Sequence, residues 1–106
     1  MDDIKEASEL IERMKAVLPI SAHPTKKICH SLKNENGIKL KPKHLLKIED
    51  VMYMGNEGGI GCAISIKDDE ELLVISLTHL RIKEIHSLSK EIRAYQVKRI
   101  RELANI

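Results

Sequence analysis

The stretch MYMGNEGGIGCAISI, residues 52–66, decides the fold, because it places four glycines within seven positions between two apolar segments. Gly and Asn adopt positive φ angles at little cost, and a tight chain reversal requires such angles. A Walker-type phosphate loop ends in Lys followed by Ser or Thr, and neither follows these glycines. A dinucleotide-binding loop opens a helix, whereas a strand-like segment follows here. The stretch therefore predicts a hairpin between two paired strands.

Alternating side chains mark the strand after the glycines. Ile60, Cys62, Ile64 and Ile66 recur at every second position, which predicts that they share one face. The opposite face carries Gly61, Ala63 and Ser65, and the small Gly61 and Ala63 allow a helix or a second subunit to approach the sheet closely.

Three further segments are predicted as strands, and a charged turn, residues 67–71, precedes the last of them. The segments are IKLK (38–41), LLKIEDVMYM (45–54) and LLVISLTHLRI (72–82). The last has apolar side chains on both faces up to Leu77, which is typical of a strand at the centre of a sheet.

Helical periodicity marks both ends of the chain. Residues 2–19 carry apolar side chains at spacings of three and four, and Pro19 ends the pattern. A shorter helix is predicted over 21–37, with Pro24 at its first turn and Gly37 at its exit. The C-terminal segment, 86–106, is predicted as a helix that gathers Leu88, Ile92, Tyr95, Ile100 and Leu103 on one side.

These elements predict one α+β domain over residues 1–106. The expected order is α-α-β-β-β-α, with a three- to four-stranded antiparallel sheet and helices packed on one face. Hydrophobic residues make up 42 % of the chain and aromatic residues only 2 %, so the core is expected to consist of Ile, Leu, Val and Met.

No catalytic, cofactor or metal motif stands out. Cys29 and Cys62 form no CxxC pair, and the histidines form no HxxxH pair. Both thiols and His79 are therefore interpreted as structural. We expect no cofactor, no metal and a non-enzymatic role, and a small enzyme that uses Glu57 with Asp50 or His79 stays open as an alternative.

The polar tip of the glycine loop is the first candidate binding site. Asn56, Glu57 and Gly58 lie where a rigid hairpin would present a loop to a partner. The alternative interpretation is a simple turn without a binding role.

A run of lysines is the second candidate. Residues 23–47 carry a net charge of +6, and Lys39, Lys41 and Lys43 alternate along the predicted strand. Lysines on an edge strand commonly prevent aggregation. A charged row of this kind also suits an acidic or nucleic-acid partner, with Lys90, Lys98 and Arg101 of the last helix adding a second basic stripe.

Function and location follow as expectations. The N-terminus lacks the layout of a signal peptide, and no apolar run approaches the roughly 20 residues that span a bilayer. Free cysteines are typical of a reducing compartment, so we expect a cytoplasmic protein that does not interact with membranes. The leading hypothesis is a small non-enzymatic protein-interaction or regulatory module that self-associates. The alternative is a weak, sequence-nonspecific nucleic-acid binder that uses segment 26–47 and the C-terminal helix.

Overall fold

The computed structural model describes residues 3–65 and 72–104, and every structural statement here concerns those residues. In chain order the elements are α1 (Asp3–Lys15), β1 (Ile20–Pro24), α2 (Lys26–Asn36), β2 (Leu46–Tyr53), α3 (Gly55–Gly58), β3 (Ile60–Ser65), β4 (Leu72–Ser76), the 3-10 helix η1 (Leu77–His79), β5 (Leu80–Ile82) and α4 (Ser89–Ala104). The predicted charged turn, residues 67–71, lies outside the described part of the chain.

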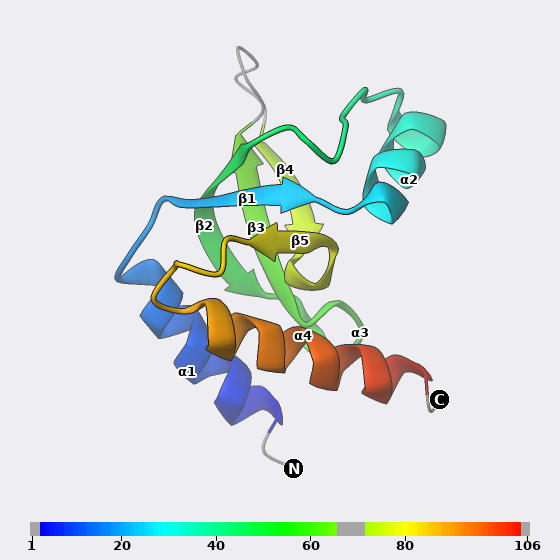
Figure 1. Ribbon diagram of the computed structural model, residues 1–106. Coiled ribbons are helices and arrows are strands. Elements are labelled where there is room, and N and C mark those ends of the chain that lie inside the picture. The colour runs from blue at the N-terminus through cyan, green and yellow to red at the C-terminus, as the bar shows by residue number, and fades with distance from the viewer. Residues whose placement is uncertain (1–2, 66–71, 105–106) are drawn as a thin grey trace.

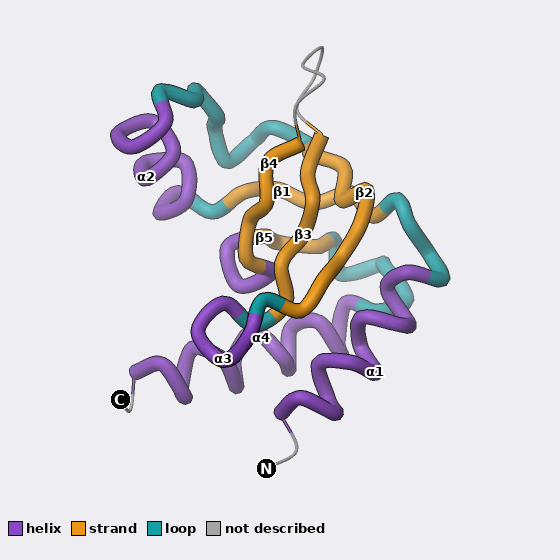
Figure 2. The backbone as a smooth tube through the Cα atoms, turned by 180° about the vertical axis from the view of Figure 1, so that it is seen from behind, coloured by secondary structure: helices purple, strands orange, loops and turns teal. Residues whose placement is uncertain are grey.

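The strands form one antiparallel sheet in the order β4-β3-β2-β1-β5. The sheet twists strongly, so that β1 and β5 cross in front of β2, β3 and β4 in Figure 1. Helices α1 and α4 lie side by side at one end of the molecule, and α2 lies at the other end (Figures 1 and 2). Two ion pairs, Arg13 with Glu91 and Lys98 with Glu6, join α1 to α4.

One buried cluster lies between the sheet and the helices. Its members are Ala7, Leu10, Met14, Ile20, Ala22, Leu32, Leu46, Ile48, Val51, Ile60, Cys62, Ile64, Ile75, Leu77, Leu80, Leu88 and Ile92. The predicted burial of Ile60, Cys62 and Ile64 is confirmed, because all three are fully buried, whereas Ile66 lies outside the described residues. Gly61 and Ala63 on the other face of β3 are buried as well. Since α1, α2, α4 and every strand contribute to the same cluster, the prediction of one α+β domain with an antiparallel sheet is confirmed.

The predicted hairpin around the glycines is also present. Strands β2 and β3 pair through Tyr53 and Ile60 at the closed end. Inside the loop, Met54 N donates to Gly59 O at 2.7 Å, and Gly59 N donates to Gly55 O at 2.8 Å. These bonds enclose the single helical turn α3, so the loop reverses the chain and does not open a long helix.

The element order differs from the prediction at β1. This strand separates the first two helices and raises the strand count to five, against the predicted three or four. Pro24 ends β1 instead of starting α2, and Thr25 caps the helix by accepting a hydrogen bond from Ile28 N at 3.3 Å. The strand was missed because five residues bounded by prolines contain too few alternations to reveal a period.

The predicted strand over residues 38–41 is wrong. These residues lie in a loop that turns around Pro42, where His44 N donates to Lys41 O at 3.0 Å and Lys41 N donates to His44 Nδ1 at 3.1 Å. Alternation in the sequence does reflect burial, since Ile38 packs against the core. Pro42 lacks an N–H, and the chain satisfies its polar groups locally instead of in a strand ladder.

The prediction of one central strand over residues 72–82 is also wrong. The segment divides into β4, η1 and β5, and the two strands lie at opposite edges of the sheet. Ser76 begins the turn by accepting a hydrogen bond from Thr78 N at 3.4 Å. Gln96 of α4 then holds the turn, because its Nε2 donates to Leu77 O at 2.7 Å and to Leu80 O at 2.6 Å.

The predicted C-terminal helix is confirmed with shorter bounds. Leu88 and Ile92 are buried as expected. Ile100 and Leu103 remain 46 % and 43 % exposed, because the second half of α4 extends past the core (Figure 1). Sequence periodicity did not identify Gln96, which is only 2 % exposed.

Candidate functional site

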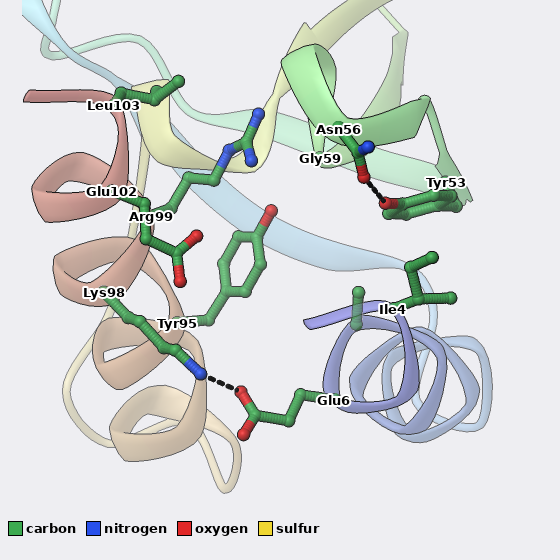
Figure 3. A pocket seen from close by; sticks show the side chains of 11 residues that line it. Ile4, Glu6, Tyr53, Asn56, Gly59, Tyr95, Lys98, Arg99, Glu102 and Leu103 are labelled. Atoms are coloured by element: carbon green, nitrogen blue, oxygen red, sulfur yellow. Dashed lines mark hydrogen bonds and ion pairs between the residues drawn. The ribbon is translucent and has the colours of Figure 1, made fainter. Parts of the chain in front are cut away.

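A pocket of about 510 Å³ lies between α1, α4 and the loop of the β2–β3 hairpin. Figure 3 shows its side chains entering from all three elements. The pocket exists because α1 and α4 pack against each other at one end of the sheet, while the hairpin loop closes over the gap between them. Its volume falls within the range that small-molecule sites usually occupy.

Both aromatic residues of the chain line this pocket, which we call the tyrosine pocket. Tyr53 lies at the end of β2, and Tyr95 lies on α4. The chain contains no other aromatic residue, since it has two Tyr, no Phe and no Trp. Aromatic rings are typical of ligand sites because they offer large apolar surfaces with a polar tip.

Tyr95 joins α4 to the hairpin at the base of the pocket. Its hydroxyl oxygen accepts a hydrogen bond from Ile60 N at 2.9 Å. Burial raises the pKa of Tyr95, whereas this hydrogen bond and the nearby Arg99 act in the opposite direction. The hydroxyl is therefore protonated at neutral pH, and its proton is available to donate toward the pocket.

Gly59 allows this close approach. A Cβ atom at this position would collide with Tyr95 Oη and would lie 3.1 Å from Arg99 Nε. The residue also has a φ of +63°, in the region that side chains disfavour. Any residue with a side chain would push α4 away from the hairpin, so this wall of the pocket requires glycine.

Arg99 contributes a positively charged guanidinium to the tyrosine pocket. In Figure 3 its guanidinium extends from α4 toward the hairpin loop, beside the hydroxyl of Tyr95. Its Nη2 atom is buried and has no hydrogen-bond partner among the described residues. An unpaired buried donor is costly, and such groups are uncommon in folded proteins.

The rim of the pocket carries mixed charge. Lys98 Nζ lies 2.7 Å from Glu6 Oε2, which closes the rim between α4 and α1. Glu102 contributes a second carboxylate from α4. Opposite them, Tyr53 Oη donates to Asn56 Oδ1 at 3.2 Å.

The structure separates the residues that the sequence singled out. Asn56 lines the tyrosine pocket, and Gly58 is the last residue of α3. The side chain of Glu57 lies outside the described part of the structure. Among the described side chains of the predicted binding tip, Asn56 lines the pocket.

The lysines lie elsewhere. Lys39, Lys41 and Lys43 are exposed in the loop between α2 and β2, at the end of the molecule opposite to α1 and α4 (Figures 1 and 2). They do not form the charged strand face that was predicted. The basic stripe of α4 lines a shallow groove, to which Lys90, Lys98 and Arg101 all contribute, and Lys98 also lies at the rim of the tyrosine pocket.

Sequence reasoning missed the three residues that build the pocket, Gly59, Tyr95 and Arg99. Tyr95 was placed on the apolar side of its helix, and Gly59 was treated only as a turn residue. The signal available in the sequence was the low aromatic content. The chain has only two aromatic residues, so a common location for both could have been tested.

A second surface is the outer side of β4. This strand pairs only with β3, and Leu72 and Val74 are 58 % and 47 % exposed. On the neighbouring strand β3, the expected space over Gly61 is filled by the chain itself, since a Cβ atom there would lie 2.5 Å from Met54 Sδ. Gly61 therefore accommodates Met54 of the same hairpin.

The cysteines and histidines form no additional site within the described ranges. Burial raises the pKa of the Cys62 thiol to about 12, and burial also raises the pKa of Cys29. No group of three metal-ligating side chains comes together among the described residues. Within the same ranges, no helix has the length and apolar character to cross a membrane.

No family model, curated protein or solved structure matches this chain. The chemistry of its own residues is therefore the basis for interpreting the pocket and the β4 surface.

Proposed function

We propose that the chain is a non-enzymatic protein-interaction module that self-associates by pairing β4 with β4 of a second copy. The observation that carries the proposal is the exposed, uncharged edge of the sheet at β4. The outer side of an edge strand presents unpaired backbone N–H and C=O groups, and these groups favour pairing with another strand.

The sequence of β4 suits two-fold pairing. Its five residues centre on Val74, so an antiparallel pair of copies would place Val74 opposite its own counterpart. Leu72 would then lie opposite Ser76, and the cross-strand neighbours would cover part of the exposed surface of Leu72 and Val74. Apolar and β-branched cross-strand pairs of this kind stabilise a sheet.

The other edge of the sheet is protected. At β5, Arg81 Nη1 donates to Thr78 O and to Leu80 O, both at 3.0 Å. Gln96 covers the same edge from α4, because it also donates to Leu80 O. Side chains therefore occupy backbone acceptors at β5, whereas β4 carries no charged residue at all.

Replacing Val74 with Lys tests the proposal by placing a charge at the centre of the proposed pair. We expect the wild-type chain to sediment as a dimer at about 100 μM, a concentration at which contacts of modest affinity are occupied. Val74→Lys is expected to sediment as a monomer with unchanged secondary structure, because its side chain is already half exposed in the single copy.

Ile85→Lys is the matched control, because Ile85 is 92 % exposed and lies between β5 and α4, away from β4. This variant is expected to remain dimeric. A wild-type monomer at the same concentration would contradict the proposal, and so would a Val74→Lys variant that stays dimeric.

Nonspecific nucleic-acid binding is the second proposal, and the basic groove on α4 supports it. The loop lysines lie at the opposite end of the molecule, so the two basic regions do not form one continuous strip (Figure 1). Anisotropy of a labelled oligonucleotide would test it, with binding expected at about 50 mM salt and a steep decrease on adding more. Absent or salt-independent binding would contradict it.

A further inference from the structure

The tyrosine pocket has the composition of a small-molecule site. Ile4, Ala7 and Leu103 provide apolar surface along α1 and α4, and the two tyrosine rings extend it. A few polar groups converge on this surface from different elements. A largely apolar wall with few polar groups is how proteins usually bind small organic ligands.

Arg99 indicates the charge of the ligand. Arg99 lines the pocket, and its Nη2 lacks an acceptor among the described residues. Because this atom is buried, the guanidinium has to turn toward the pocket for Nη2 to donate to a bound acceptor. The planar fork of Arg matches a carboxylate, which can accept two parallel hydrogen bonds. An acceptor placed beside Arg99 would also lie near the hydroxyl of Tyr95, which points to the same part of the pocket (Figure 3).

The remaining charges limit that ligand to a single negative charge. Lys98 and Glu6 neutralise each other at the rim. Glu102 contributes a carboxylate to the same pocket, and it would repel a second negative charge on a bound molecule. A phosphate dianion is therefore disfavoured relative to a monocarboxylate.

We propose that the tyrosine pocket binds a small organic monocarboxylate, with its carboxylate on Arg99 and its apolar body against the tyrosine rings and Ile4. The pocket opens at the α1–α4 end of the molecule, and the proposal does not depend on self-association through β4. Gly59 is a positioning residue in this site, because its missing side chain allows Tyr95 and Arg99 to reach the loop.

Two matched pairs of probes isolate the carboxylate. Benzoate and benzamide share a planar body, while 4-methylpentanoate and 4-methylpentanamide share a branched one, and only the charge differs within a pair. Amide NMR spectra of the full chain are recorded during titration to about 10 mM of each probe, a range that detects millimolar affinity. We expect at least one carboxylate to bind about tenfold more tightly than its amide, with shifts at Gly59, Ile60 and Arg99.

Arg99→Gln is expected to remove this tenfold preference, whereas Arg101→Gln keeps it. Arg101 is the matched control because it lies on the same helix but lines the groove on the other side of α4. The comparison of carboxylate with amide on the wild-type chain remains valid even if Arg99→Gln fails to fold.

Four results would overturn the proposal. These are the absence of binding by both carboxylates, equal binding of a carboxylate and its amide, shifts confined to residues outside the pocket, and inorganic phosphate binding as tightly as the better carboxylate. A carboxylate preference that persists in folded Arg99→Gln would overturn the role of Arg99 and with it the proposed site.

Discussion

The β2–β3 hairpin and the segment 72–82 are both rich in strand-forming residues, yet only the hairpin has the structure that its sequence indicates. In the hairpin, the glycines and the loop hydrogen bonds they permit lie within a few residues of one another. In the segment, the turn at η1 depends on Gln96, which is 19 positions from Leu77. The difference teaches that a local signal suffices only where the hydrogen-bonding partners are local as well.

The contrast also has an energetic side. At the turn, Leu77 O accepts a hydrogen bond from Leu80 N, and Leu80 O accepts one from Arg81 Nη1. Gln96 Nε2 donates to both carbonyls as well, so this buried side-chain amide ties the turn to α4. Hydrophobic periodicity cannot identify such a residue, because Gln contributes no apolar signal.

Among the substitutions that test this comparison, Gln96→Glu is expected to change the stability of the protein most. At neutral pH the carboxylate has nearly the shape of the amide but no hydrogen to donate, so it faces two carbonyl oxygens in a buried site. We expect the free energy of unfolding to fall by about 3 kcal/mol, the scale of an unsatisfied buried charge and its lost hydrogen bonds. Urea unfolding measures the total, and amide exchange should show protection lost over 72–82 before the hairpin.

Ala94→Glu is the control for that substitution. It adds the same charge to the same helix at an exposed position, so its stability should stay close to that of the wild type. Equal destabilisation by the two variants, or unchanged stability of Gln96→Glu, would show that Gln96 does not hold the turn.

Gly59→Ala is expected to have the next largest effect, and it acts on the hairpin. The added Cβ atom meets Tyr95 Oη, and the positive φ adds strain, which together should lower the unfolding free energy by about 2 kcal/mol. Gly55→Ala provides the comparison, since Gly55 also has positive φ (+87°) but has nothing within 4 Å of an added Cβ. Gly55→Ala should lower the unfolding free energy by about 1 kcal/mol, which is the contribution of backbone strain alone.

A double substitution separates the collision from the strain. Tyr95→Phe removes the hydroxyl that the new methyl group would meet, so Gly59→Ala should cost less in the Tyr95→Phe background than in the wild type. The coupling between the two sites, measured by urea unfolding, should be about 1 kcal/mol. Additive effects would mean that α4 does not pack on the hairpin through this pair of residues.

These cases define how much the sequence alone predicts. The α+β class, the antiparallel sheet, the chain reversal at the glycines and the buried face of β3 follow from patterns within about ten residues. Strand β1 and the division of 72–82 do not, because short segments show no period and the stabilising contacts come from distant residues. Of the residues that line the tyrosine pocket, Asn56 and Lys98 were among the predicted binding residues. Tyr95 and Arg99 join the pocket through the packing of α4, which no local pattern encodes.

The smallest effect that we expect is a dependence of stability on pH, and it arises from His79 in the segment 72–82. Burial lowers the pKa of His79 below its usual 6.5, and the positive charges of Lys27 and Arg81 act in the same direction. As the pH falls below about 6.5, the unfolded chain takes up this proton before the folded chain does, so stability is complete above that pH and declines below it.

His79→Gln should therefore flatten the decline in unfolding free energy between about pH 7.5 and pH 5.5 by less than about 1 kcal/mol, because the ring is only partly buried. If His79→Gln leaves the decline unchanged, the environment of η1 does not disfavour the imidazolium. A flattened decline would instead show that the turn which sequence patterns missed is also an acid-sensitive point of the fold, whereas the hairpin contains no histidine at all.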